Sequence, residues 1–172
     1  MRFYRYVPTL ALALGFTPGF AQVLAAQERP RPVIDFSGGW AGFPDESMIH
    51  HRTVGGSARF YATPKLSVGP EVVYMVGPGT DRDLFVTGNV TYEWPLLARG
   101  RVPRLMPFVV ASGGYMRHWP RFGTFISHTG AVVGGGGVRF RITDRVSAGP
   151  DLRLGWELHL RAAGTVSIGL GP

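Results

Sequence analysis

Cysteine is absent from the 172-residue chain, and lysine, charged residues in general and long apolar runs are scarce. Without cysteine the chain can form neither a disulfide framework nor a thiolate metal site, so packing and hydrogen bonds must supply its rigidity. After residue 26 no stretch of 18 consecutive apolar residues offers a membrane-spanning helix. Glycine (25 residues) and proline (14) interrupt almost every window, which disfavours long helices. With 45% apolar and 17% charged residues, the composition also excludes a disordered chain, because such a chain has too few apolar residues to bury.

The basic character of the chain comes almost entirely from arginine. The formal net charge is +7, and Lys65 is the single lysine. A nucleic-acid-binding surface would concentrate its basic residues in a run or stripe, whereas these arginines are scattered singly. We therefore expect no nucleic-acid partner and favour anionic lipid head groups as the counter-charge.

The first 26 residues have the three parts of a secretory signal peptide. Arg2 and Arg5 give a positive start, residues 7–16 are apolar, and small residues permit cleavage after Ala25 or Ala26. An uncleaved membrane anchor is the alternative, but the apolar run is short and flanked by prolines. The sequence thus predicts a signal peptide over residues 1–26 and one mature domain over residues 27–172.

The mature chain alternates apolar and polar residues with a period of two, which is typical of β-strands. Eight segments of about ten residues cross a bilayer when tilted, and the even count suits a membrane barrel. The sequence predicts an all-β, eight-stranded, antiparallel, up-and-down transmembrane β-barrel. The phase of the fifth segment and the position of the last turn stay open, and the glycine run 134–137 predicts a bulge or kink. The segments are 34–41, 53–62, 67–76, 84–94, 106–117, a sixth ending at 142, 146–154 and 159–170.

An internal repeat supports this hairpin order. Residues 65–72 (KLSVGPEV) are echoed by residues 145–152 (RVSAGPDL), in the third and seventh predicted strands. Short connections at 63–65 and 143–145 predict periplasmic turns. Residues 44–51, 77–83 and 118–127 are the predicted extracellular loops.

The two faces of the predicted strands differ in a way that indicates which one meets lipid. One face is apolar, with Trp and Tyr near its ends, as expected at a membrane interface (Trp40, Tyr74, Tyr92, Trp94 and Trp156). The other carries Ser, Thr and Gly with single charges that nearly balance, which a narrow packed lumen requires. The expected lumen charge network comprises Asp35, Arg59, Glu71, Glu93, Arg139, Arg141, Asp151, Arg153 and Arg161.

Residues 135–147 (GGGVRFRITDRVS) resemble a glycine-rich strand and Thr-Asp turn of small bacterial outer-membrane barrels, namely the OmpA-type transmembrane domain and OmpW-like proteins. The resemblance implies location in the outer membrane after Sec-type export. The implied partners are outer-membrane lipid, lipopolysaccharide and the barrel-assembly machinery. The protein is expected to be a monomer. The chain departs from the pattern at its last residues (SIGLGP), where such proteins usually carry a terminal aromatic residue.

No motif for catalysis or metal binding emerges from the sequence. Ser127 and His128 are adjacent and would face opposite sides of a strand, so the His-x-Ser spacing of acyl-ester deacylase barrels is missing. The pair at residues 50–51 (HH), near Asp45 and Glu46, could bind a metal, but we expect these histidines to be solvated in a loop. We therefore predict no enzyme and no cofactor, with a role in envelope structure, adhesion or small-ligand handling. The alternatives are a lipid-modifying outer-membrane enzyme and a soluble periplasmic lipocalin-like barrel that binds an apolar ligand.

Overall fold

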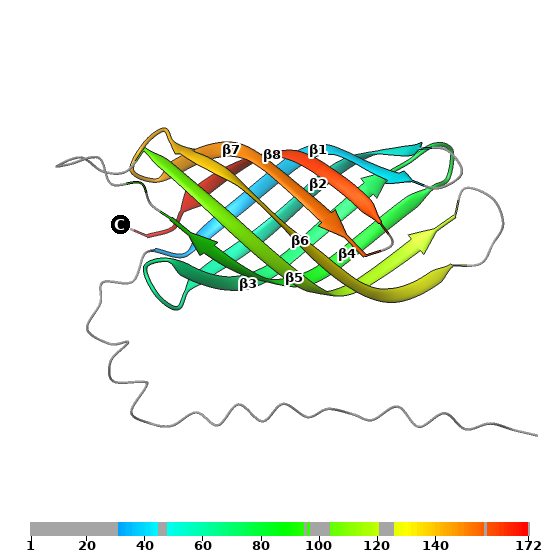
Figure 1. Ribbon diagram of the computed structural model, residues 1–172, viewed down its shortest axis with the longest axis horizontal. Coiled ribbons are helices and arrows are strands. Elements are labelled where there is room, and N and C mark those ends of the chain that lie inside the picture. Colours follow the sequence, from blue (N-terminus) through cyan, green and yellow to red (C-terminus); the bar gives the residue numbers. More distant parts are fainter. Residues whose placement is uncertain are drawn as a thin grey trace, which may run out of the picture.

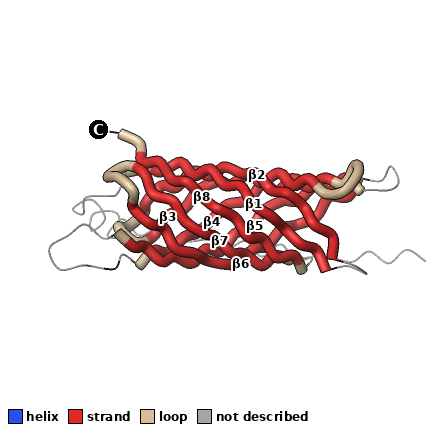
Figure 2. The backbone as a smooth tube through the Cα atoms, turned by 90° about the horizontal axis from the view of Figure 1, so that it is seen from above, coloured by secondary structure: helices blue, strands red, loops and turns tan. Residues whose placement is uncertain are grey.

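A computed structural model of the chain describes residues 31–44, 48–94, 96, 104–120, 126–156 and 158–171. The expected signal peptide, residues 1–26, lies outside these residues. Each strand pairs antiparallel with its sequence neighbours, and β1 pairs with β8 to close the barrel (Figures 1 and 2). None of the described residues forms a helix long and apolar enough to cross a membrane. The strands are β1 (Val33–Pro44), β2 (Met48–Tyr61), β3 (Leu66–Val76), β4 (Arg82–Glu93), β5 (Leu105–Trp119), β6 (Ser127–Arg141), β7 (Val146–Gly155) and β8 (His159–Gly169).

The fold class predicted from the period of two is confirmed, because all eight segments are strands of one closed antiparallel barrel. The two ends of the barrel differ in what they carry. The terminal end holds the start of β1, the end of β8 and the turns 62–65 and 142–145. The loop end is the opposite one and holds the connection 77–81 and the turn 156–158. In Figure 1 the terminal end lies at the left, beside the C-terminus.

The structure corrects or completes several details of the sequence prediction. The predicted bulge at 134–137 is wrong, since these glycines pair without a register break with both β5 and β7. The fifth strand is phased with Phe108, Val110 and Met116 toward the lumen. The last turn lies at 156–158, where Gly155 pairs with His159 across the hairpin.

The barrel is apolar outside and polar inside. Among the described residues, buried polar or charged side chains outnumber buried apolar ones by twenty to nine. Large apolar side chains such as Phe36, Val54 and Leu152 are instead more than half exposed on the outer face. Water-soluble proteins bury apolar groups, so this inverted distribution is the one that a lipid environment favours.

Aromatic side chains lie near both ends of the outer face. Near the terminal end, Tyr92 and Trp94 pack edge to face, with ring centroids 4.8 Å apart. Near the loop end, the indole N–H of Trp40 donates to Nδ1 of His50 at 3.1 Å, and Trp156 is exposed in the last turn. Such rings prefer the head-group region, where an apolar body and a polar tip are both accommodated.

The internal repeat is a repeat of structure as well as of sequence. In the turn 62–65, Oγ1 of Thr63 accepts from the backbone N–H of Leu66 at 3.0 Å, and in the turn 142–145 Thr143 accepts from Val146 at the same distance. The following Gly-Pro pairs, 69–70 and 149–150, both lie opposite a gap in the ladder to the preceding strand. The hairpins β2–β3 and β6–β7 are therefore the same unit, offset by 80 residues in the chain.

The glycine of each repeat is required by a close approach of two backbones. A Cβ atom at Gly149 would overlap the carbonyl oxygen of Val138, and a Cβ at Gly69 would overlap that of Ala58. Because the obstacle is backbone rather than the tip of a flexible side chain, the strands themselves would have to separate.

We expect the substitution Gly149→Ala to lower the free energy of unfolding by about 1–3 kcal/mol, the usual cost of an overpacked site. Urea titration of the folded barrel in lipid vesicles, followed by its gel mobility, measures this change. Gly113→Ala is the matched control, because a Cβ there meets nothing within 4 Å. Equal destabilisation by the two substitutions would contradict the close-approach argument.

Candidate functional site: the charged lumen

A cluster of charges fills the lumen near the terminal end; we call it the Glu93 cluster (Asp35, Arg59, Tyr61, Glu93 and Arg139). Arg59 forms a two-pronged contact with Asp35, with Nε and one Nη at 2.7 and 3.0 Å from its two oxygens. Glu93 accepts hydrogen bonds from Arg59, from Arg139 at 2.6 Å and from the hydroxyl of Tyr61 at 2.9 Å. The guanidinium of Arg139 also stacks 3.8 Å above the ring centroid of Phe108. Four strands, β1, β2, β4 and β6, are thereby joined across the lumen.

A second cluster lies deeper in the lumen; we call it the Glu71 cluster (Glu71, Asn89, Asp151, Arg153 and Arg161). Glu71 accepts from Arg153 at 2.7 Å, from Arg161 at 2.9 Å and from Asn89 at 3.1 Å. Arg153 also contacts both oxygens of Asp151 through Nε, at 3.0 and 3.1 Å. This cluster joins β3, β4, β7 and β8.

Both clusters are neutral by composition, since each holds two arginines and two carboxylates. All eight of these side chains are less than a tenth exposed. A buried charge without a partner costs several kcal/mol, so pairing within each cluster is a condition for burying any of them. Shared bidentate contacts lower that cost further, because one guanidinium serves two carboxylates.

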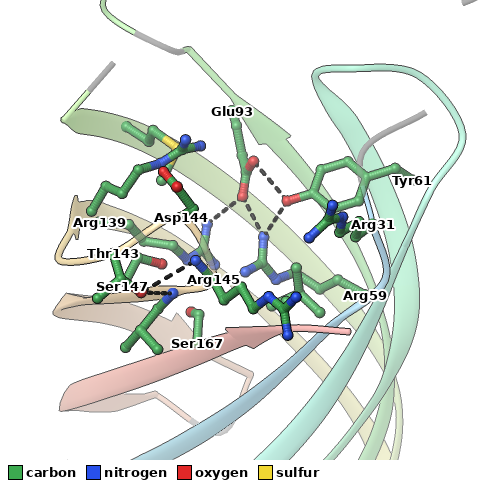
Figure 3. Close-up of a pocket in the computed structure, with 15 residues that line it drawn as sticks. Arg31, Arg59, Tyr61, Glu93, Arg139, Thr143, Asp144, Arg145, Ser147 and Ser167 are labelled. Atoms are coloured by element: carbon green, nitrogen blue, oxygen red, sulfur yellow. Dashed lines mark hydrogen bonds and ion pairs between the residues drawn. The ribbon is translucent and has the colours of Figure 1, made fainter. Parts of the chain in front are cut away.

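Eight of the nine residues expected in the lumen network thus occupy the two clusters, and Arg141 does not. Arg141 is half-buried at the terminal end, and among the described residues it forms no ion pair. It lines a cavity of about 250 Å³ that opens at this end below the Glu93 cluster. The exposed residues Arg31, Asp144 and Arg145 line this cavity together with the buried Arg59, Glu93 and Arg139 (Figure 3).

Toward the loop end the lumen changes from charged to apolar. Inward side chains from five strands pack together there, with Phe43 against them (Ala41, Val73, Met75, Phe85, Met116 and Ala131). Sequence patterning did not indicate this layer, because Val72, Val73 and Tyr74 are apolar on both faces of β3. Ion pairs therefore occupy the lumen toward the terminal end, and an apolar layer follows them toward the loop end.

The histidines lie differently from the sequence expectation. His50 and His51 belong to β2 rather than to a loop, so they point to opposite faces. His50 is exposed beside Trp40, whereas His51 is buried in the lumen, which corrects the expectation that both are solvated. The proposed neighbours Asp45 and Glu46 lie outside the described residues. Asp81 and Asp83, assigned to a loop by sequence, approach His51 instead.

The described residues contain no serine hydroxyl that is hydrogen-bonded to a histidine. His128 lies on the outer face, where its Nδ1 contacts the hydroxyl of Tyr115. His159 is buried and stacks on Phe43, with Nδ1 3.2 Å from the carbonyl oxygen of Trp156. Glu157, its neighbour in sequence, lies outside the described residues.

No family model and no curated protein sequence matches the chain. Solved structures match its fold. Neisserial surface protein A is 10% identical with a TM-score of 0.64, and the match covers 81% of this chain and 96% of that one. The N-terminal β-barrel domain of Pseudomonas aeruginosa OprF is 14% identical with a TM-score of 0.64, covering 84% and 100%. The outer-membrane enzyme PagL is 15% identical with a TM-score of 0.50, covering 80% and 99%. The chain thus has the eight-stranded barrel fold of small outer-membrane proteins.

We expect Glu93→Gln to destabilise the barrel by about 3 kcal/mol or more, because it leaves a buried arginine charge without compensation. Urea unfolding in vesicles gives the free energy. Asp144→Asn is the control at the exposed mouth and should change stability by less than about 0.5 kcal/mol.

A double variant separates charge balance from packing. Arg139→Met combined with Glu93→Gln restores neutrality, so it should be less destabilising than the sum of the two single changes. Strict additivity would show that the two residues are not energetically coupled.

Proposed function

We propose that the protein is a non-enzymatic, monomeric β-barrel of the bacterial outer membrane whose closed lumen gives it a structural role in the envelope. The observation that carries this proposal is the lumen itself. Two neutral charge clusters and an apolar layer occupy successive levels of it. Eight-stranded barrels have an interior just wide enough for side chains, so such levels leave no continuous path for solutes.

The outer surface supports the membrane location. Exposed apolar side chains cover the middle of the barrel, aromatic rings lie near both ends, and the closed sheet leaves no strand edge unpaired. Lipid requires all three properties, because backbone polar groups find no partner in hydrocarbon. A lipocalin-like barrel would have the opposite arrangement, with an apolar cavity inside and charges outside.

Lipopolysaccharide fits as a lipid partner at the loop end. Val76 of β3 pairs with Arg52 of β2 on one side and with Arg82 of β4 on the other, and both arginines face outward. Arg117 lies on the adjoining β5. Arg117 stacks on Trp119, with its guanidinium carbon 4.5 Å from the ring centroid. Arginines in the aromatic region suit phosphate groups, which they bind in a bidentate manner.

A non-enzymatic role is preferred over lipid modification because of the histidine environments. A hydrolase would need a nucleophile within hydrogen-bond reach of its base. The outward histidines contact Trp40 and Tyr115, and neither contact provides a serine.

Cell fractionation tests the location. We expect the protein in the outer-membrane fraction, released by detergent alone, and we expect unheated samples to migrate faster on gels than boiled ones. Both results follow from a closed apolar-coated barrel that resists unfolding by detergent. Recovery from the soluble periplasm without detergent would instead favour the lipocalin-like alternative.

Planar-bilayer recordings test the closed lumen. The purified folded protein should give no discrete conductance steps above those of detergent alone, because charges and apolar side chains fill the lumen. A general porin recorded in the same bilayers is the positive control. Reproducible steps whose frequency scales with added protein would refute the structural role proposed here.

A further inference from the structure

A third group of titratable side chains lies at the loop end of the lumen, apart from the two arginine clusters. His51 of β2 places its Nε2 3.3 Å from Oδ2 of Asp81 and 3.3 Å from Oδ2 of Asp83. Asp81 ends the connection between β3 and β4, and Asp83 lies in β4. The three ligating atoms all lie within 4.8 Å of one another.

These side chains are buried without the partners that buried charges elsewhere in the lumen have. His51, Asp81 and Asp83 are 3%, 4% and 1% exposed. Among the described residues, neither ring nitrogen of His51 has a hydrogen-bond partner, although Nε2 lies near the two carboxylates, and Oδ1 of Asp81 has none. A buried imidazole with both nitrogens unbonded is costly, because each polar atom has lost its water.

The charges of this group are also unbalanced. In the Glu93 and Glu71 clusters every carboxylate contacts an arginine, whereas the ion-pair partners of Asp81 and Asp83 among the described residues are imidazoles. The nearest arginine in sequence, Arg82, directs its guanidinium to the carbonyl oxygens of Gly77 and Asp81. Two adjacent buried carboxylates without an arginine partner form an environment that favours a bound cation.

The surroundings hold the His51 ring in place. A Cβ atom at residue 77 would overlap the ring, so only glycine leaves room for it. Phe43 packs edge to face on the ring, with centroids 4.9 Å apart. The N–H of Gly77 donates to the carbonyl oxygen of Asp81 at 3.0 Å and fixes the connection that carries this carboxylate.

The two separations between His51 and the aspartates suit a tetrahedral metal ion. Two ligand atoms each about 2.05 Å from a tetrahedral Zn²⁺ are about 3.3 Å apart. This value agrees with both separations from Nε2 of His51 to the aspartates. Nδ1 of His118, in β5, lies 2.7 Å from Oδ1 of Asp83, the oxygen that does not face His51. A hydrogen bond there orients the carboxylate toward the ion.

We propose that His51, Asp81 and Asp83 bind a divalent transition-metal ion of the zinc type. Nε2 of His51 and one oxygen of each aspartate supply three ligands, and the fourth position is left for water or an external ligand. His118 is a positioning residue that holds Asp83. One imidazole and two carboxylates suit zinc-type ions, whereas Ca²⁺ and Mg²⁺ prefer more oxygen ligands. The ion neutralises the aspartates and ties β2 to β4 at the loop end.

Equilibrium dialysis of the folded, untagged protein against Zn²⁺, followed by elemental analysis, tests the site. The unaltered protein is expected to bind one zinc ion per chain. His51→Gln and Asp83→Asn should abolish this binding, and His118→Gln should weaken it by about 10–100-fold, as loss of an orienting partner does. His50→Gln is the matched control, because it removes the adjacent imidazole on the outer face.

Cobalt provides a second readout. Co²⁺ bound in a tetrahedral site gives visible absorption bands, which should appear with the unaltered protein and His50→Gln and be absent with His51→Gln. Heat-modifiable gel mobility ensures that every variant is folded before it is measured. Equal zinc binding by the unaltered protein and folded His51→Gln would overturn the proposal, as would a loss of binding in His50→Gln alone. The first result would mean that any zinc the protein binds lies at another site and does not use His51.

Discussion

Compensation of buried charge inside the barrel is the constraint on which the rest of the structure depends. A closed barrel in lipid has no outer surface to which a charged lumen side chain could escape, and an unpaired charge costs several kcal/mol. The two neutral clusters meet this requirement with side chains from seven of the eight strands, and β5 adds Phe108 beneath Arg139. The contacts that neutralise the charges are therefore also the contacts that hold opposite walls of the barrel together.

The internal repeat explains how the two clusters are built. Each repeated hairpin supplies an arginine, Arg59 or Arg139, to the Glu93 cluster, and a carboxylate, Glu71 or Asp151, to the Glu71 cluster. The arginine and the carboxylate that the repeat supplies do not pair with each other, since they lie in different clusters. Their counter-charges are Asp35, Glu93 and Arg161, from strands outside the two hairpins, and Arg153, which lies in β7 just after the repeated segment 145–152. Repeat and non-repeat strands thus depend on each other.

Sequence periodicity predicted the strands and most of the charged lumen because alternation directly reports which side chains share a face. It failed where alternation carries no information. Val73 and Met75 lie among apolar neighbours on both faces, so the apolar layer gave no signal. Asp81 lies in the connection, as predicted, whereas Asp83 lies in β4 rather than in the predicted loop. Alternation did not indicate their approach to His51, because it depends on the path of the connection. Arg141 has the correct face but lies one pleat too close to the mouth to be buried.

The loop end differs from the rest of the lumen in what neutralises it. Four lumen carboxylates have arginine partners, whose charge is permanent under all physiological conditions. Asp81 and Asp83 have imidazoles, whose positive charge or metal-binding form depends on the solution. With the metal site proposed above, the contacts that join β2, β4 and β5 at the loop end depend on the supply of the ion, whereas those at the terminal end do not. The histidine–aspartate group thus lies at the end that carries the predicted extracellular loops. The arginine–carboxylate pairs of the Glu93 cluster lie at the opposite end, which holds the start of β1 and the end of β8.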